Sequence, residues 1–242
     1  MRVIQFSIFS SLILALAACS STPAPIHDRT SPQPAPSKKD YRTVRPESGE
    51  IRAANVKRLY PNKRLFVCRG MQVTNKPPTN GNNEVTTYSR LVVVDGKVPI
   101  VTAPANNACV SSGFGFRWNK EHQGIDITSR PASRVFAGGS GTILEAGYNG
   151  GYGLAVLIDH GQGVYTRYAH LNHIESDIKV GAKVVYGHPI GLMGKSGHVT
   201  GVHLHYEILT GRYQPNVRGR GLRPRDPFSF PAWVDDRLEK IG

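Results

Sequence analysis

Residues 154–171 of the chain read LAVLIDHGQGVYTRYAHL, and the pattern in this stretch indicates the fold class. Two runs rich in β-branched and aromatic residues, 155–158 and 164–168, are separated by a short segment that contains two glycines. Such runs are typical of strands joined by a turn. Short β-rich runs broken by glycines extend from 108 to 209, with little helical periodicity. We therefore predict an all-β, mainly antiparallel fold, built as a compact, glycine-rich sheet or sandwich.

A β-hairpin is the clearest element before this region. Residues 88–94 and 97–102 are rich in β-branched side chains and flank Asp95-Gly96. This pair suits the positive backbone φ angles of a two-residue type I′ turn. The expected organisation is a β-containing N-terminal segment at 51–107, a main domain at 108–230, and a C-terminal tail at 231–242. We expect the tail to form a short helix.

The first nineteen residues have the pattern of a bacterial targeting signal. Arg2 precedes an apolar stretch at 3–18, which ends in Leu16-Ala17-Ala18-Cys19. We predict a signal peptide at 1–18. The alternative is an uncleaved anchor helix, but about sixteen residues is short for a bilayer, which needs roughly twenty. The last four residues resemble the bacterial lipobox, which implies that Cys19 receives lipid, becomes the mature N-terminus and attaches the protein to a membrane.

A tether follows the lipidation site. Residues 19–50 are rich in proline, serine, threonine and alanine, a composition typical of a disordered linker. Ser20 stands where an aspartate would resemble the signal for retention in the inner membrane. In an organism with two membranes, the resemblance therefore favours the outer membrane, facing the periplasm.

The chain is strongly basic, with 30 lysines and arginines against 17 acidic residues and a net charge of +13. This balance indicates an anionic partner, or alternatively only aids solubility. Nucleic acid is the usual partner of a basic domain, but an exported protein rarely meets it, so we expect no nucleic acid. The carboxylates of peptidoglycan and anionic lipid headgroups are the anions of the cell envelope.

Two of the three cysteines remain once Cys19 is assigned to lipid. Cys68 and Cys109 form an even pair in an oxidising compartment, which predicts a disulfide between them. The alternative is two free buried thiols.

The histidines are concentrated, since eight of the nine lie between 122 and 205. His203 and His205 fall in an apolar run that predicts a strand, where residues i and i+2 project from the same face. His122 and Asp126 flank a short turn that contains glycine, so both can reach one ion. Imidazole and carboxylate are good ligands for zinc. A catalytic zinc needs three protein ligands and an open position, whereas a structural site is closed by four.

Several motifs occur in one order along the chain. They are Ser112-Gly113-Phe114-Gly115-Phe116-Arg117, His122-x-x-x-Asp126, Tyr168-Ala169-His170-Leu171 and Gly201-Val202-His203-Leu204-His205-Tyr206-Glu207. Gly151-Tyr152-Gly153 and the closing Asp226-Pro227-Phe228 accompany them. With these motifs, residues 108–230 resemble the lysostaphin/LytM zinc metallopeptidases, and the resemblance implies that family's fold, with its duplicated hybrid motif.

The resemblance implies one zinc ion per chain, bound by His122, Asp126 and His205. It also implies that His170 and His203 are catalytic and line the groove beside the metal. The other histidines receive no catalytic role: we expect His160 to shape a turn, His27 belongs to the tether, and His173, His188 and His198 are unassigned.

The function that the resemblance implies is a peptidoglycan endopeptidase, acting on stems or cross-links and most of all on the bond between D-alanine and diaminopimelate. Two alternatives remain open at this point. One is a non-catalytic LytM-type activator of cell-wall amidases, and the other is a structural wall-binding lipoprotein. Amidases, division proteins and other lipoproteins are candidate partners. A further hypothesis is that residues 51–105, held by a Cys68–Cys109 disulfide, cover part of the groove and restrain activity.

Overall fold

The computed structural model describes residues 62–71 and 73–233. The predicted signal peptide, Cys19, the tether and residues 234–242 of the predicted tail lie outside the described residues, so these assignments stay predictions. Within the described ranges, no helix has the length and apolar character needed to cross a membrane.

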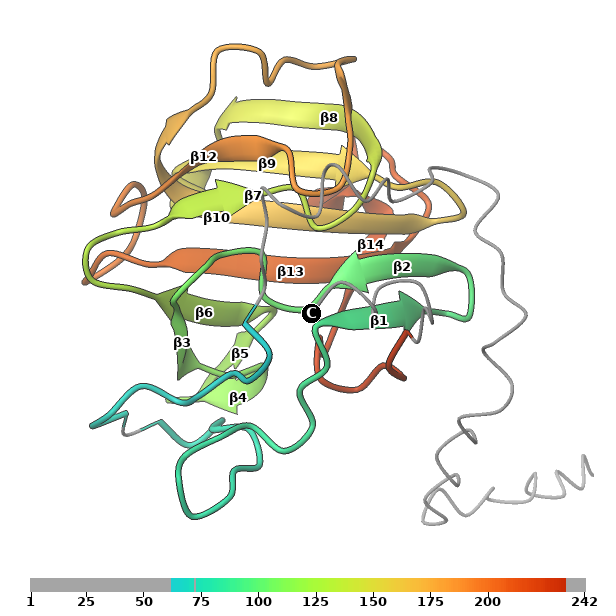
Figure 1. Cartoon of the computed structure of the whole chain (residues 1–242). Helices are drawn as coiled ribbons and strands as arrows, with labels where there is room; N and C mark the ends of the chain where they lie inside the picture. The colour runs from blue at the N-terminus through green and yellow to red at the C-terminus, as the bar shows by residue number, and fades with distance from the viewer. Residues whose placement is uncertain (1–61, 72, 234–242) are drawn as a thin grey trace, which may run out of the picture. The chain divides into compact units, whose positions relative to one another are not determined.

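The secondary structure of residues 62–71 and 73–233 consists of strands and two short 3-10 helices (Figure 1). The prediction of an all-β, mainly antiparallel fold is confirmed, because every pairing between these strands is antiparallel. The elements are β1 (Leu91–Val94), β2 (Val98–Val101), β3 (Cys109–Ser112), β4 (Gly115–Arg117), β5 (Lys120–His122), β6 (Ile125–Thr128), β7 (Arg134–Phe136), β8 (Gly141–Tyr148), η1 (Gly150–Tyr152), β9 (Leu154–Asp159), β10 (Val164–Ile174), β11 (Lys183–Val184), β12 (Pro189–Met193), β13 (Leu204–Gly211), η2 (Arg218–Gly221) and β14 (Leu222–Arg225).

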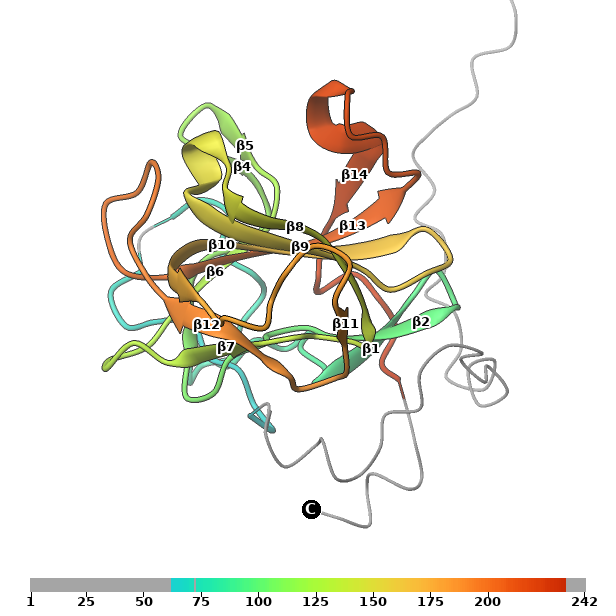
Figure 2. The same cartoon turned by 90° about the horizontal axis from the view of Figure 1, so that it is seen from above.

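The main sheet is organised around β10 and β13, which lie side by side at its centre. Its principal strand order is β11-β8-β9-β10-β13-β6-β3. Strand β12 also pairs with β10 and leads to β7, while β14 pairs with β13. Figure 2 shows β8, β9, β10 and β6 in one layer, with β12, β7, β1 and β2 in the layer below. The main sheet continues through β12 and β7 into the second layer, where the separate β1–β2 hairpin also lies, so the domain is a sandwich.

The core lies between these layers and is rich in β-branched residues, as expected for strands packed on both sides. Two buried tyrosines of the central strands connect the layers by hydrogen bonds. The Tyr206 hydroxyl donates to the carbonyl of Val101 at 2.8 Å, and the Tyr168 hydroxyl accepts from the amide of Gly138 at 2.7 Å. These contacts fix the strands that carry the predicted site residues.

The described part of the N-terminal segment shares this core. Leu65, Val67 and Val85 belong to the same cluster of buried residues as the central strands. The predicted hairpin is present as β1 and β2, and Asp95 and Gly96 have φ angles of 49° and 68°. Within the described residues, the segment is thus packed as part of the main domain.

A disulfide joins the segment to β3, because Cys68 and Cys109 are bonded and their Cα atoms lie 5.0 Å apart. The amide of Cys68 donates to the carbonyl of Val110 at 2.9 Å, and the amide of Val110 donates to the carbonyl of Phe66 at 2.8 Å. The segment therefore holds the strand that leads into the predicted site.

Candidate metal centre

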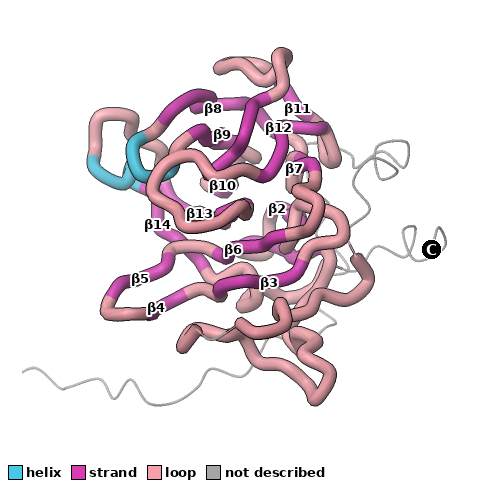
Figure 3. The backbone as a smooth tube through the Cα atoms, turned by 90° about the vertical axis from the view of Figure 1, so that its left-hand side faces the viewer, coloured by secondary structure: helices cyan, strands magenta, loops and turns pink. Residues whose placement is uncertain are grey.

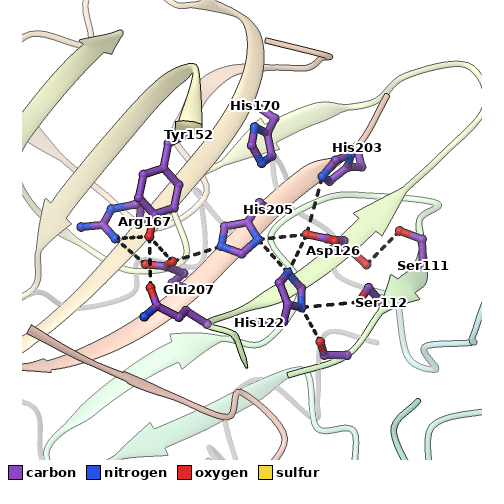
Figure 4. A network of polar contacts seen from close by, with 12 residues as sticks. Ser111, Ser112, His122, Asp126, Tyr152, Arg167, His170, His203, His205 and Glu207 are labelled. Carbon is purple, nitrogen blue, oxygen red and sulfur yellow. Dashed lines mark hydrogen bonds and ion pairs between the residues drawn. The ribbon is translucent and has the colours of Figure 1, made fainter. Parts of the chain in front are cut away.

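Three predicted ligands meet at the junction of β5, β6 and β13 (Figure 4). Asp126 on β6 is the register partner of His205 on β13, and His122 ends β5. The Nε2 atom of His122 lies 3.1 Å from Asp126 Oδ1 and 3.0 Å from His205 Nδ1, and the latter two atoms are 2.9 Å apart. The three residues are buried. Three donor atoms thus converge on one point.

A glycine makes this convergence possible. Gly124 lies in the turn between His122 and Asp126, and a Cβ atom at this position would stand 2.3 Å from the backbone oxygen of Tyr206. The turn can therefore pack against β13 only without a side chain. This close approach carries His122 to the ligands on the neighbouring strands.

The outer nitrogens of both ligand histidines have acceptors. The Nδ1 of His122 donates to the carbonyl of Gly113, and the Nε2 of His205 donates to Glu207 Oε1 at 3.1 Å. These bonds favour the tautomers in which His122 Nε2 and His205 Nδ1 have free lone pairs toward each other. The donor set of two imidazoles and one carboxylate, spaced by about 3 Å, fits a zinc ion with one open position.

His170 and His203 lie beside this triad. Their ring centroids are 4.9 Å apart, and His203 Nε2 lies 3.6 Å from Asp126 Oδ1. His170 Nδ1 donates to the carbonyl of Ser196 at 2.9 Å, and His203 Nδ1 donates to the carbonyl of Gly201 at 3.0 Å. In both rings Nε2 is therefore the nitrogen that can accept a proton.

The backbone of His170 is unusual. Its φ angle is 61°, a value that few residues other than glycine adopt, and it lies where the pairing of β10 with β9 shifts register. The bulge turns the side chain of His170 toward the other histidines, at 5.8 Å between its ring centroid and that of His205. Local strain at this position thus serves the geometry of the site.

The pKa shifts differ between Asp126 and the two flanking histidines, His170 and His203. Burial opposes ionisation of Asp126, but hydrogen bonds from His122 and His205 outweigh it and hold the pKa of Asp126 well below its usual range. Burial, together with the charge of nearby His203, lowers the pKa of His170 to about 4. Burial also lowers the pKa of His203. At neutral pH the site therefore combines an anionic ligand with two neutral imidazoles that can act as bases.

The site opens into a groove of about 1260 Å³. Its walls include the turn between β4 and β5, the loop that precedes β13, the loop after β6 and η1. Figure 3 shows β4 and β5 below the central strands and the loop before β13 in front of them. Val73, from the N-terminal segment, also lines the groove. Basic side chains on the groove are Arg117, Lys120 and Arg130.

Four residues near the site received no role from the sequence. Arg117 lies 3.3 Å from Asp126 Oδ2 and donates to the Ser112 hydroxyl at 2.6 Å. Glu207 accepts from His205 and pairs with Arg167, which stacks on Tyr152. Glu207 could have been found, because it follows His205 by two residues on a strand and so shares its face.

The remaining histidines lie apart from the triad. His160 is buried at the end of β9, where its Nδ1 donates to the carbonyl of Ser140 at 2.8 Å, which suits a role in shaping the turn. His173 and His188 pair with acidic residues at 3.8 and 2.9 Å. His198 lines the groove.

Residues 120–217 match the model of peptidase family M23. The matched region contains all five predicted site residues. Together with the relatives below, the match makes this region of the chain similar to M23 peptidases. Because the lysostaphin/LytM resemblance rests on the same motifs, the two findings agree on the domain that carries the site.

Curated proteins similar to this region include two named enzymes. The peptidoglycan DD-endopeptidase ShyC of Vibrio cholerae is 33% identical over 128 residues, which cover 50% of this chain and 29% of that protein. The DD-carboxypeptidase/endopeptidase Mpg of Neisseria meningitidis is 40% identical over 104 residues, which cover 40% of this chain and 24% of that protein. The chain thus spans less than a third of the length of these relatives.

Among solved structures, the catalytic domain of the antimicrobial peptidase lysostaphin from Staphylococcus simulans is similar. It is 28% identical, with a TM-score of 0.43, over 50% of this chain and 90% of that one.

Proposed function

We propose that the protein is a zinc-dependent endopeptidase that hydrolyses peptide bonds in peptidoglycan stems or cross-links, with the bond between D-alanine and diaminopimelate as its target. One observation carries the proposal: three donor atoms converge within about 3 Å at the floor of an open groove, with two further histidines beside them. A structural metal site would be closed by a fourth ligand instead.

The roles of the site residues follow from their positions. His122, Asp126 and His205 would hold one zinc ion, which when bound supplies Lewis-acid activation of water and of the scissile carbonyl. His170 and His203 present Nε2 toward the same space, and their lowered pKa values keep them neutral, so either ring can accept a proton during hydrolysis.

The groove has the charge expected for an acidic substrate. Lys120 and Arg130 line it, and among the described residues neither has an acidic partner. Of the described residues that line the groove, Asp126, the proposed ligand, is the only acidic one. Peptidoglycan stems carry free carboxylates, so attraction to such a groove would weaken as salt concentration rises. The similarity to ShyC, a peptidoglycan DD-endopeptidase, supports the same polymer as the substrate.

The cellular location belongs to the same proposal. Lipid on Cys19 would attach the enzyme to the outer membrane facing the periplasm, and the tether would let the domain search the nearby wall. In this position a cell-wall amidase, a division protein or another lipoprotein could act with it. Labelling with a radioactive fatty acid tests the attachment, because a Cys19→Ser variant should lose the label.

The direct test is muropeptide release from purified sacculi by the protein with zinc. Matched samples contain a chelator, the His170→Ala variant or the His203→Ala variant. Release that is lost in all three supports the zinc endopeptidase. If each chain binds one zinc ion but no muropeptide is released, a non-catalytic activator of cell-wall amidases becomes the better account. The protein should then stimulate a cell-wall amidase added to the same sacculi.

A further inference from the structure

A charged cluster with a buried ion pair lies beside His205, on the opposite side of its ring from Asp126 and His122 (Figure 4). It consists of Tyr152, Arg167 and Glu207. Glu207 is 0% exposed and Arg167 is 6% exposed. Arg167 donates to Glu207 Oε2 at 2.6 Å, and the Tyr152 hydroxyl donates to Glu207 Oε1 at 2.8 Å. The guanidinium of Arg167 stacks on the Tyr152 ring, 4.6 Å from its centroid.

The cluster contacts the candidate metal centre through one carboxylate oxygen, Glu207 Oε1. Glu207 Oε1, which accepts from Tyr152, also accepts from His205 Nε2 at 3.1 Å. His205 Nδ1, on the opposite side of the ring, is the atom that approaches Asp126 and His122. A carboxylate in this position fixes both the rotation and the tautomer of the imidazole that it contacts.

Stability alone is a weak reason for such a cluster. A buried ion pair must lose the water around both charges, and well-packed apolar side chains of similar volume are often equally stable. A second carboxylate of the sheet serves as a comparison. Tyr213 donates to Glu145 at 2.9 Å and Arg220 pairs with it at 2.8 Å, but these partners are more exposed, and neither contact involves a proposed ligand. Of these two clusters, only the one with the buried Arg167–Glu207 pair is joined to a proposed ligand.

We infer that Glu207 is a positioning residue for the metal centre, which holds His205 with Nδ1 directed at the metal. Arg167 compensates the charge of Glu207 and orients its carboxylate. Tyr152 is the third member, and because its side chain also lines the groove, it connects the cluster to the place where substrate would lie. This inference rests on the proposed function in one respect, namely that the triad binds zinc.

The test compares Glu207→Gln with Glu145→Gln, which removes the carboxylate of the comparison cluster. Zinc affinity is measured by competition with a chromogenic chelator, so no peptidase activity is needed. We expect Glu207→Gln to weaken zinc binding about 10- to 100-fold, and Glu145→Gln to leave it unchanged. Measured with zinc bound, nitrogen-15 chemical shifts of the His205 ring should show a proton on Nε2 in the wild type and a mixture of ring states in Glu207→Gln.

A second variant covers the case in which Glu207→Gln does not fold because Arg167 has lost its partner. Arg167→Met combined with Glu207→Gln removes both charges, and circular dichroism checks its fold. This double variant should fold and still bind zinc at least 10-fold more weakly than the wild type. If a folded variant binds zinc as tightly as the wild type, the positioning role is wrong while the peptidase proposal stands. If the wild type itself binds no zinc, both fail.

Discussion

Asp126 and His205 stand directly opposite each other on paired antiparallel strands, and their side-chain atoms Oδ1 and Nδ1 are 2.9 Å apart. The two residues are 79 positions apart in the chain. The candidate metal centre therefore depends on the register between β6 and β13. A slip of one residue in that register would turn one of the two side chains to the other face of the sheet.

The turn that brings His122 to this pair should be sensitive to a single methyl group. Gly124→Ala places a Cβ atom 2.3 Å from the backbone oxygen of Tyr206, so β13 or the turn must move. We expect a loss of about 1–3 kcal/mol in the free energy of unfolding and weaker zinc binding. Gly81→Ala is the control, because a Cβ atom there meets nothing within 4 Å. Equal unfolding curves for both variants would contradict the packing described here.

Zinc should stabilise the folded protein through the three ligands. At a zinc concentration of about 100 times Kd, binding to the native state alone adds about 2.7 kcal/mol, so the unfolding temperature should rise. Asp126→Asn keeps the size of the side chain but removes its charge, and we expect the rise to disappear. Thermal unfolding followed by circular dichroism, with and without zinc, gives the comparison. An undiminished rise in Asp126→Asn would exclude the aspartate as a ligand.

The protein should lose stability on acidification because of His160. Burial lowers the pKa of His160 to about 4, against 6.5 for an exposed histidine, although its bond to the Ser140 carbonyl acts in the opposite direction. Below pH 6.5 the unfolded chain binds a proton here that the folded chain does not. The contribution of His160 to the free energy of unfolding is therefore complete above pH 6.5. It decreases as the pH falls from 6.5 to about 4, by about 3 kcal/mol in all.

The measurement is urea unfolding of the wild type and of His160→Gln between pH 7 and pH 4. The glutamine does not titrate, so the free energy of unfolding of the variant should fall less steeply over this range, whatever its absolute stability. Parallel pH profiles for the two proteins would show that His160 is not responsible.

The disulfide between Cys68 and Cys109 closes a loop with a sequence separation of 41. On the chain-entropy model, a loop of this length contributes about 4 kcal/mol to the free energy of unfolding. We expect Cys68→Ser with Cys109→Ser to lose an amount of that order in denaturant unfolding, and a reductant to have the same effect on the wild type. A loss below about 1 kcal/mol would mean that core packing alone holds the segment.

Much of the fold and site could be predicted, because the signals are local. Alternation along 203–205 places two histidines on one face, and Asp95-Gly96 indicates the turn of a hairpin. These rules depend only on neighbours in the chain. The ligand set followed from residue types and from a family resemblance.

The rest depends on pairings between distant segments. The predicted Cys68–Cys109 disulfide places the run around Leu65 and Val67 near β3, but its apolar character does not indicate which core residues it packs against. Arg117 meets Asp126 because the turn of β4 and β5 folds over the site. The positive φ angle of His170 results from a bulge, which no local pattern in the sequence marks.

The most direct test of the central claim is hydrolysis of a purified muropeptide dimer, cross-linked from D-alanine to diaminopimelate, followed by mass spectrometry. With one zinc ion per chain, the wild type should convert the dimer into its two monomers. His170→Ala and His203→Ala should bind zinc as before and lose at least about 100-fold in rate, because general acid–base catalysis contributes about 10²- to 10⁴-fold. An intact dimer after incubation with the zinc-loaded wild type, or undiminished cleavage by both variants, would contradict the account.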